Sequence, residues 1–336
     1  MESHSNRGVF FYFRKWIRLI LLPLVQGTEE VLVGGQAVIE GVMMRSPHAW
    51  AVAVRKASGS VAVSQNYLDR PSERHPWLKY PLLRGLGVLG QAMVLGVRAL
   101  RYSALEALDE EKAAEVKAKK KPEFSNWLLT LNLVCSLGFF ILFYKFLPLY
   151  VATFIQHHYG VIHNFIAFNL VDGVIRLALF LAFLVLLAQS KEIKRVFEYH
   201  GAEHKVVWAF ETTGGHVDLE NARHATRFHP RCGTSFLLVV MVIALVIYLF
   251  LPFRSFAWKL ISRILLLPVI AGVSYEFIRF AAKSQGWIWR WASQPGLWLQ
   301  RITTREPDDT QLEVAMKALE SAMELEKTRG GELVIA

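Results

Sequence analysis

Two histidines stand four residues apart in the segment Tyr199-His-Gly-Ala-Glu-His-Lys205, and a glutamate directly precedes the second. If this segment is helical, His200 and His204 project from one face, so both imidazoles can bind one metal ion. Glu203 then lies on nearly the same face, where it can act as a general base on water held by that ion. The order His-x-x-Glu-His is typical of inverted zinc hydrolases. The segment therefore predicts a divalent metal site, with zinc as the expected ion and Glu203 as the catalytic residue.

More ligand types follow within a short distance along the chain. Five of the 11 histidines fall in residues 200–229, and a His-x-x-Cys spacing adds a thiolate to an imidazole. The candidate metal ligands are His200, His204, His229 and Cys232. If all four bind, the site is closed and structural, whereas three ligands would leave a fourth position open to water and substrate. A third alternative is that no metal binds and the histidines are hydrogen-bonded within a folded cytoplasmic loop.

The composition indicates a membrane protein. Of the 336 residues, 53% are hydrophobic, the mean hydropathy is +0.30, and the apolar residues are concentrated in long runs. We expect four transmembrane helices at about 127–147, 170–189, 234–251 and 257–281. The predicted fold class is an α-helical integral membrane protein with a small N-terminal antiparallel β region and cytoplasmic or interfacial helices. The two cysteines, Cys135 and Cys232, imply no disulfide framework, which suits a reducing compartment.

The distribution of lysine and arginine predicts the orientation of these helices. Residues 151–173 contain neither, whereas residues 190–233 contain seven. Because positive charge is retained on the cytoplasmic side, we expect the His-rich loop 190–233 and both termini to lie in the cytoplasm, below a bacterial inner membrane. Charged residues inside the apolar segments, Asp172 with Arg176 and Lys259 with Arg263, must pair or reach the outer interface.

Four parts follow from these patterns. They are a basic amphipathic membrane-surface segment (1–30), a small α+β domain with a charged linker (31–125), the four-helix membrane domain (126–282), and an interfacial aromatic belt with a C-terminal helix (283–336). Within the second part, residues 31–67 indicate antiparallel strands. The helical segment 82–105 is expected to be interfacial or buried, because only about 20 Å of helix separates Arg84 from Arg98.

Three further charged residues are site candidates. Strand alternation from Val38 onward places Glu40 on an apolar face, so it is either paired inside the small domain or points into a site shared with the histidines. Arg45 ends the same segment. Glu276 lies near the inner end of the last apolar segment, where it either pairs with Arg279 or supplies a metal ligand.

The C-terminal helix, about 308–327, carries an apolar stripe with nearly heptad spacing. Its members are Leu312, Met316, Leu319 and Met323. Such a stripe packs either on the chain's own small domain or on another copy, and we expect a homo-oligomer. Membrane lipids are the other expected partners. The net charge of +10 comes without a nucleic-acid-binding motif, so nucleic acid is not an expected partner.

Four segments together resemble the YqhQ family, bacterial membrane proteins described as predicted metal-dependent enzymes. They are Gly34-Gly-Gln-Ala-Val-Ile-Glu-Gly-Val-Met-Met-Arg45, Glu198-Tyr-His-Gly-Ala-Glu-His-Lys205, His229-Pro-Arg-Cys-Gly-Thr-Ser235 and Pro295-Gly-Leu-Trp-Leu-Gln-Arg-Ile-Thr-Thr-Arg-Glu-Pro307. The resemblance covers nearly the whole chain. It implies the family, while the chemistry is argued from the histidine motif itself.

These observations favour a hydrolase whose metal site lies on the cytoplasmic face of a membrane. A lipid-linked molecule or a peptide segment would suit that location as substrate. The alternative from another class is an oligomeric scaffold or regulator, in which the metal or histidine cluster is structural. A third hypothesis is a transporter, although the chain has no obvious internal repeat.

Overall fold

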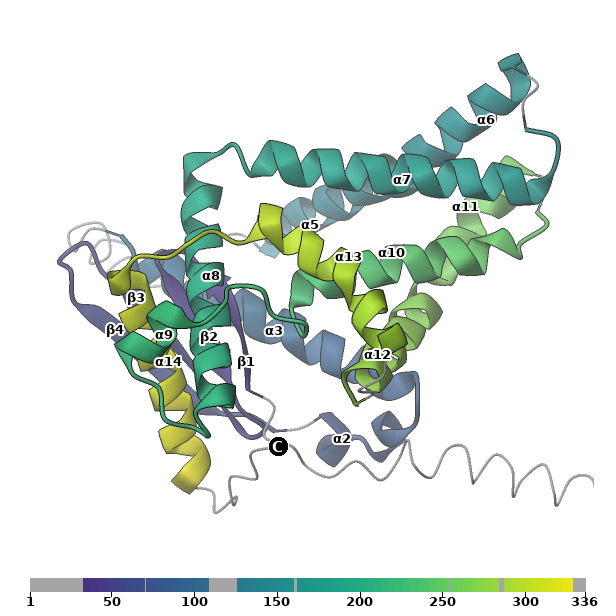
Figure 1. Ribbon diagram of the computed structural model, residues 1–336. Helices are drawn as coiled ribbons and strands as arrows, with labels where there is room; N and C mark the ends of the chain where they lie inside the picture. The colour runs from purple at the N-terminus through teal and green to yellow at the C-terminus, as the bar shows by residue number, and fades with distance from the viewer. Residues whose placement is uncertain are drawn as a thin grey trace, which may run out of the picture.

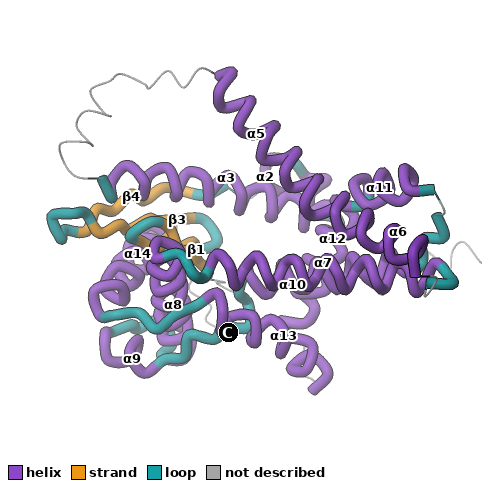
Figure 2. The backbone as a smooth tube through the Cα atoms, turned by 90° about the horizontal axis from the view of Figure 1, so that it is seen from above, coloured by secondary structure: helices purple, strands orange, loops and turns teal. Residues whose placement is uncertain are grey.

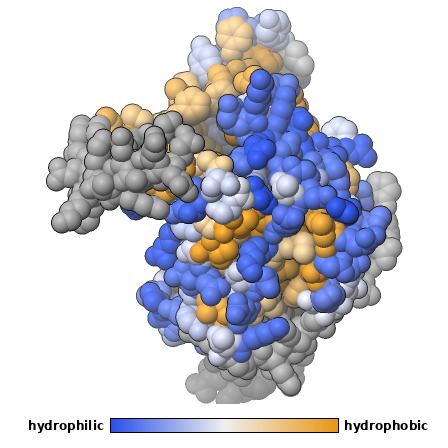
Figure 3. Space-filling model, turned by 90° about the vertical axis from the view of Figure 1, so that its left-hand side faces the viewer, coloured by the Kyte–Doolittle hydropathy of each residue, from blue (hydrophilic) through white to orange (hydrophobic). Residues whose placement is uncertain are grey.

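The computed structural model describes residues 33–69, 71–108, 126–159, 162–253, 255–283 and 287–328, and the side chains of all of these except 126–130, 132–133 and 282–293. The predicted surface segment 1–30 and the charged run 109–121 lie outside these ranges. The described chain forms a layer built on a β-sheet and, beside it, a group of long apolar helices (Figure 1). Hydrophilic side chains cover most of the outer end of the sheet layer, with smaller hydrophobic patches between them (Figure 3).

The predicted antiparallel strands are confirmed. Four strands pair in the order β1-β2-β3-β4, and their bounds are Gly34–Val38, Gly41–Arg45, Ala49–Arg55 and Val61–Tyr67. Successive side chains of a strand point to opposite faces, and both faces of the central strands are buried. Val42, Met44, Ala51 and Ala53 lie in one core, whereas Met43, Val52 and Val54 lie in another. The sheet therefore needs helices on both sides.

Helix α3 (Leu83–Glu106) covers one face, and α8 (Lys191–Thr212) with α14 (Asp309–Thr328) covers the other (Figure 2). Short helices α2 (Pro71–Arg74) and η1 (Pro76–Lys79) precede α3, and α9 (Leu219–His224) follows α8. The sheet layer thus combines three parts of the chain that lie far apart in sequence, which differs from the contiguous domain 31–125 that we expected.

The segment expected to be a His-rich loop, 190–233, is largely helical. Ser190 caps α8 by accepting a hydrogen bond from the backbone of Ile193. The second half of α8 is buried on all sides, including Tyr199, Val206 and Ala209, because it lies between the sheet, α14 and the segment after residue 303. A helix in this position holds the two histidines inside the protein.

The C-terminal helix is confirmed, but its stripe is buried within the chain. Asp308 and Gln311 cap α14 reciprocally, each side chain bonding to the other residue's backbone N–H. Leu312, Leu319 and Met323 are buried in the core shared with the sheet and α8. The stripe therefore packs on the chain's own sheet layer, which is one of the two alternatives considered, and the expected homo-oligomer stays a prediction.

The apolar helices extend from one side of the sheet layer. Their bounds are α5 Asn126–Ile141, a π-helical turn η2 Leu142–Phe146, α6 Leu147–Tyr159, α7 Phe165–Leu187, α10 Gly233–Leu249, α11 Phe256–Leu265 and α12 Leu267–Lys283. Three described helices are long and apolar enough to cross a membrane, namely α3, Val134–Tyr159 and α7, and the pair α11 and α12, bent by 48°, would make four.

These bounds adjust the predicted spans. The first predicted span, 127–147, continues to Tyr159, and α7 begins at Phe165 rather than near residue 170. Helix α10 is apolar but shorter than the three candidate spans. By length α3 could span, yet it buries Leu95 and Ala99 against the sheet, in agreement with the expected buried helix. Helix α13 (Trp287–Thr303) carries the tryptophan-rich segment, of which Trp298 is exposed.

Candidate metal site

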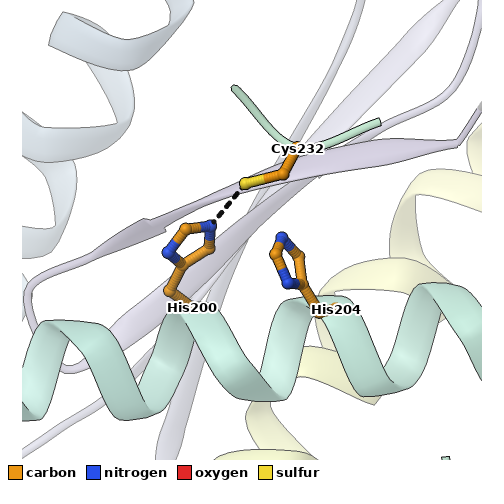
Figure 4. A group of neighbouring side chains, drawn as sticks. All are labelled: His200, His204 and Cys232. Atoms are coloured by element: carbon orange, nitrogen blue, oxygen red, sulfur yellow. Dashed lines mark hydrogen bonds between the residues drawn. The ribbon is translucent and has the colours of Figure 1, made fainter. Parts of the chain in front are cut away.

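His200, His204 and Cys232 form a compact group at the junction between the sheet layer and the apolar helices. Both histidines project from one face of α8, as predicted, and Cys232 directly precedes α10 (Figure 4). One ligand atom from each residue lies within 4.8 Å of the others, and Cys232 Sγ is 3.3 Å from His200 Nε2. Two imidazoles and a thiolate are a donor set that suits zinc.

The backbone orients both imidazoles toward this point. His200 Nδ1 is 2.8 Å from the carbonyl oxygen of Thr303, and His204 Nδ1 is 2.5 Å from that of Arg227. A carbonyl only accepts hydrogen bonds, so each Nδ1 carries the proton and each Nε2 keeps a free lone pair. Such second-shell hydrogen bonds are typical of metal-binding histidines.

The Nε2 atom of His204 is the clearest indication of a ligand. It is buried and has no hydrogen-bond partner among the described residues, although buried polar atoms are nearly always paired. Burial lowers the pKa of His204, which favours the neutral imidazole that a metal requires. The three side chains therefore fit a divalent ion.

The carboxylate of Glu203 lies beside the Nε2 atoms of both histidines. One of its carboxylate oxygens is 3.6 Å from His204 Nε2 and 4.0 Å from His200 Nε2. The residue is only 7% exposed. Burial raises its pKa, and a hydrogen bond from the backbone N–H of Gly35 partly offsets that rise. A carboxyl group with a raised pKa is a stronger base once it is ionised.

Gly35 allows β1 to lie against this carboxylate. A Cβ at residue 35 would lie 2.7 Å from Glu203 Cγ and 2.6 Å from the carbonyl oxygen of Met43. Any side chain here would collide with backbone, so the glycine is required by close approach. The first of the four motifs thereby contacts the second.

His229, predicted as a ligand, lies next to the group but is not a member of it. Its Nδ1 accepts a hydrogen bond from the backbone N–H of Arg231 at 3.3 Å, so its Nε2 carries the proton and faces Glu211 at 3.3 Å. Its ring centroid is 5.9 Å from that of His204. Both nitrogens are thus engaged, so the group that could hold a metal contains three of the four predicted ligands.

The segment from α13 to α14 holds the site together. The N–H of Arg305 donates to the carbonyl of Phe197 at 2.9 Å, and a Cβ at Gly201 would lie 1.9 Å from the carbonyl oxygen of Arg305. Fully buried Gln300 bonds to both the N–H and the carbonyl of His229. In the sequence, residues 295–307 indicate the family but no role at the site. The residue that could have indicated this contact is Gly201, because a glycine inside a helix often permits close approach of another segment.

A cavity of about 440 Å³ opens beside the group. Its wall includes Gln36, Arg45, Arg231 and Thr234 together with His200, Glu203, His204 and Cys232. Arg45, a predicted candidate, therefore does lie at the site. Burial lowers the pKa of its guanidinium, and no carboxylate in the described part of the chain pairs with it. The cavity thus offers a cation to a ligand.

The other two candidates lie elsewhere. Glu40 is in the two-residue turn between β1 and β2 with a φ of 51°, so the strand alternation that we assumed ends before it. Its carboxylate pairs with Arg195 of α8 at 2.6 Å, so Glu40 is paired as expected, but its partner lies outside the predicted domain 31–125. Glu276 pairs with Arg84 of α3 at 2.7 Å, not with the metal ligands. The proposed role of Glu276 as a ligand was wrong, since α12 faces α3.

Comparisons with known proteins agree with the motif resemblance. A family model described as "Protein of unknown function (DUF1385)" matches residues 80–325. The protein named "Uncharacterized protein YqhQ" from Bacillus subtilis (strain 168) is 33% identical over 305 residues, which cover 87% of this chain and 92% of that protein. No solved structure matches the chain. The chain therefore belongs to the DUF1385 family and is a relative of the YqhQ-like proteins that the motifs indicated.

Proposed function

We propose that this protein is a membrane-embedded, metal-dependent hydrolase. The observation that carries the proposal is the buried Nε2 of His204, which has no hydrogen-bond partner in the described ranges and lies beside His200, Cys232 and a cavity. Three protein ligands leave one position free, the arrangement of catalytic and not structural zinc sites. The apolar helices beside the site support a location at a membrane surface.

The side chains around the site divide the chemistry between them. His200, His204 and Cys232 would hold the ion, and a bound divalent ion would supply a Lewis acid for water and substrate. Glu203, which is within 4.0 Å of both imidazoles, takes the proton of the attacking water and returns it to the leaving group. Glu203 is partly held by Gly35, so its carboxylate stays aimed at the cavity.

Arg45 supports a substrate that carries negative charge. Its guanidinium lines the same cavity as Glu203, and a half-buried cation that pairs with no carboxylate of the described residues gains from pairing with an anion. A phosphate or carboxylate on a lipid-linked molecule or a peptide segment would meet this requirement. Arginine recognises both groups through two parallel hydrogen bonds.

The test compares the wild type with Glu203→Gln, both purified in mild detergent and loaded with zinc. Hydrolysis of phosphate-ester, carboxyl-ester and peptide probes is measured together with the zinc content. We expect the wild type to cleave one class of probe and the variant to be slower by about a hundredfold or more, with zinc content unchanged.

Two results would contradict the proposal. Loss of zinc from Glu203→Gln would make Glu203 a ligand and not a base. Zinc-loaded wild type without activity on any probe class, combined with unfolding on chelation, would assign the ion a structural role and favour the scaffold alternative.

A further inference from the structure

A second polar cluster lies among the apolar helices, away from the metal site. It contains one carboxylate, Asp172, and four cations, Lys145, Arg176, Lys259 and Arg263. As the sequence required, Asp172 pairs with Arg176 at 2.6 Å and also with Arg263 at 2.9 Å. Lys259 lies 3.3 Å over the ring of Phe168. The cluster therefore has more positive than negative charge.

The single carboxylate of Asp172 does not compensate the charge of Lys145, and Arg176 shares this carboxylate with Arg263. Lys145 is 4% exposed, and within the described ranges no carboxylate lies at ion-pair distance from it. Its Nζ is 5.8 Å from the centroid of the Tyr248 ring. Arg176 is 3% exposed, and its Nε has no hydrogen-bond partner in the described chain. Buried cations of this kind are costly unless an anion accompanies them.

An apolar cavity of about 460 Å³ begins at these two residues. Lys145 and Arg176 are the charged members of a lining that is otherwise almost entirely apolar. Its aromatic members are Phe139, Phe140, Phe143, Tyr144, Phe180 and Phe183. The lining comes from α5, η2, α7, α10 and α12, and it shares no described residue with the cavity at the metal site. An apolar wall with cations at one place fits an amphiphile, because a hydrocarbon chain can lie along the wall while an anionic group lies at the cations.

We propose that this groove binds a lipid whose phosphate headgroup carries net negative charge, with its hydrocarbon chain along the aromatic wall and its phosphate at Lys145 and Arg176. The inference uses the proposed membrane location but not the hydrolase activity. Arg176 lies halfway along α7, so the phosphate sits deeper than the headgroups of a surrounding bilayer. A lipid held at this depth would be retained specifically, unlike the exchanging lipids around the helices.

The test measures binding of phosphatidic acid with a fluorescent acyl chain to the full-length protein in detergent micelles. The competitors are unlabelled phosphatidic acid, phosphatidylcholine with the same acyl chains, and inorganic phosphate. We expect phosphatidic acid to compete about tenfold better than phosphatidylcholine, and inorganic phosphate not to compete. Displacement of the fluorescent lipid by inorganic phosphate would indicate a site for soluble anions and would overturn the proposal. Equal competition by the two lipids would also overturn it.

Variants separate the two halves of the site. Lys145→Met removes a headgroup contact, and Ala244→Phe fills the apolar wall without changing charge. Each should weaken binding about fivefold to tenfold. Lys259→Met is the matched control, because this cation belongs to the cluster but not to the groove, and it should bind like the wild type. Thermal unfolding shows that each variant is folded. Wild-type binding by folded Lys145→Met would refute the proposal.

Discussion

At the candidate site, a hydrogen bond to the backbone fixes the orientation of the His204 imidazole. The Arg227 carbonyl occupies one ring nitrogen, and the other points into a buried space beside His200 and Cys232. The same is true of His200, whose Nδ1 bonds to the Thr303 carbonyl. The ligands are therefore preorganised by loops and not by the helix alone, so the loops should matter for metal binding as much as the ligands do.

The glycine between the two histidines provides the sharpest test of that statement. Gly201→Ala places a Cβ where the Arg305 carbonyl lies, 1.9 Å away, so the segment holding His200 must shift. Overpacking of this kind costs about 1–3 kcal/mol. We expect a lower melting temperature and weaker zinc binding, measured by competition with a chromophoric chelator.

Gly90→Ala is the matched control, because it is also helical and has nothing within 4 Å of the new Cβ. It should be neutral or slightly stabilising, by up to about 1 kcal/mol. Equal effects of the two substitutions would mean that the Arg305 segment does not hold the site.

Residue spacing predicted part of this site and not the rest. The i, i+3 and i+4 positions of a helix fix His200, Glu203 and His204 on one side, so these could be placed from the sequence. Cys232 and His229 could not be told apart, because both are good ligands in one short loop. Gln300, more than sixty residues later, holds His229 away from the group, and no local pattern reports such a contact.

At the scale of elements, α14 depends on a polar contact at its last turn. Glu326 is buried and accepts hydrogen bonds from Ser46 Oγ at 2.7 Å and the backbone of His48 at 2.8 Å, and its other oxygen faces the His48 ring at 2.8 Å. Burial by itself raises the pKa of Glu326, but these hydrogen bonds outweigh it and hold the pKa below its ordinary value of 4.5. The contact fastens α14 to the turn between β2 and β3.

This contact predicts a pH-dependent stability. Because the folded-state pKa of Glu326 is lowered, its stabilisation is complete above about pH 4.5 and is lost as the pH falls through the folded value. Glu326→Gln should therefore cost about 2 kcal/mol near neutral pH and almost nothing in strong acid. Chemical unfolding of both proteins at several pH values measures the difference. A difference that persists unchanged in acid would rule out the ionised carboxylate as its source.

The strands, α3 and α14 of the sheet layer were predicted from the sequence, whereas the length of α8 and the partners of these elements were not. The apolar stripe on α14 predicts that this face is buried, but it does not predict which surface covers it. Packing against a second copy of the chain would have fitted the same pattern. The sheet face beside α8 decides the matter, because Ala51 and Ala53 leave room for another helix. Likewise Glu276 could be assigned a buried role, while its partner Arg84 depends on how α3 meets α12.

At the scale of the whole molecule, the sheet layer lies at one end of the apolar helices, and the turn between α6 and α7 lies at the other (Figure 1). The positive charge of residues 190–233 belongs to the first end, and residues 151–173, without lysine or arginine, belong to the second. The proposed membrane orientation puts the sheet layer and the metal site in the cytoplasm.

A labelling experiment tests this orientation. His216 and His163 are exposed at the two ends, and each is replaced by cysteine in a Cys135→Ser background, since Cys135 is exposed and Cys232 is buried. A membrane-impermeant maleimide applied to intact cells should label His163→Cys but not His216→Cys. Permeabilised cells, in which both should react, are the control. Labelling of both positions in intact cells would contradict the orientation.

The central claim is a zinc site with three protein ligands and one open position, and X-ray absorption at the zinc edge tests it most directly. The full-length protein loaded with one zinc ion should show one sulfur at about 2.3 Å and two imidazole nitrogens at about 2.0 Å, with one further light ligand. Its spectrum should be unchanged in His229→Gln and should lose the sulfur in Cys232→Ser. A spectrum with three imidazoles, a change in His229→Gln, or no tightly bound zinc would contradict the account.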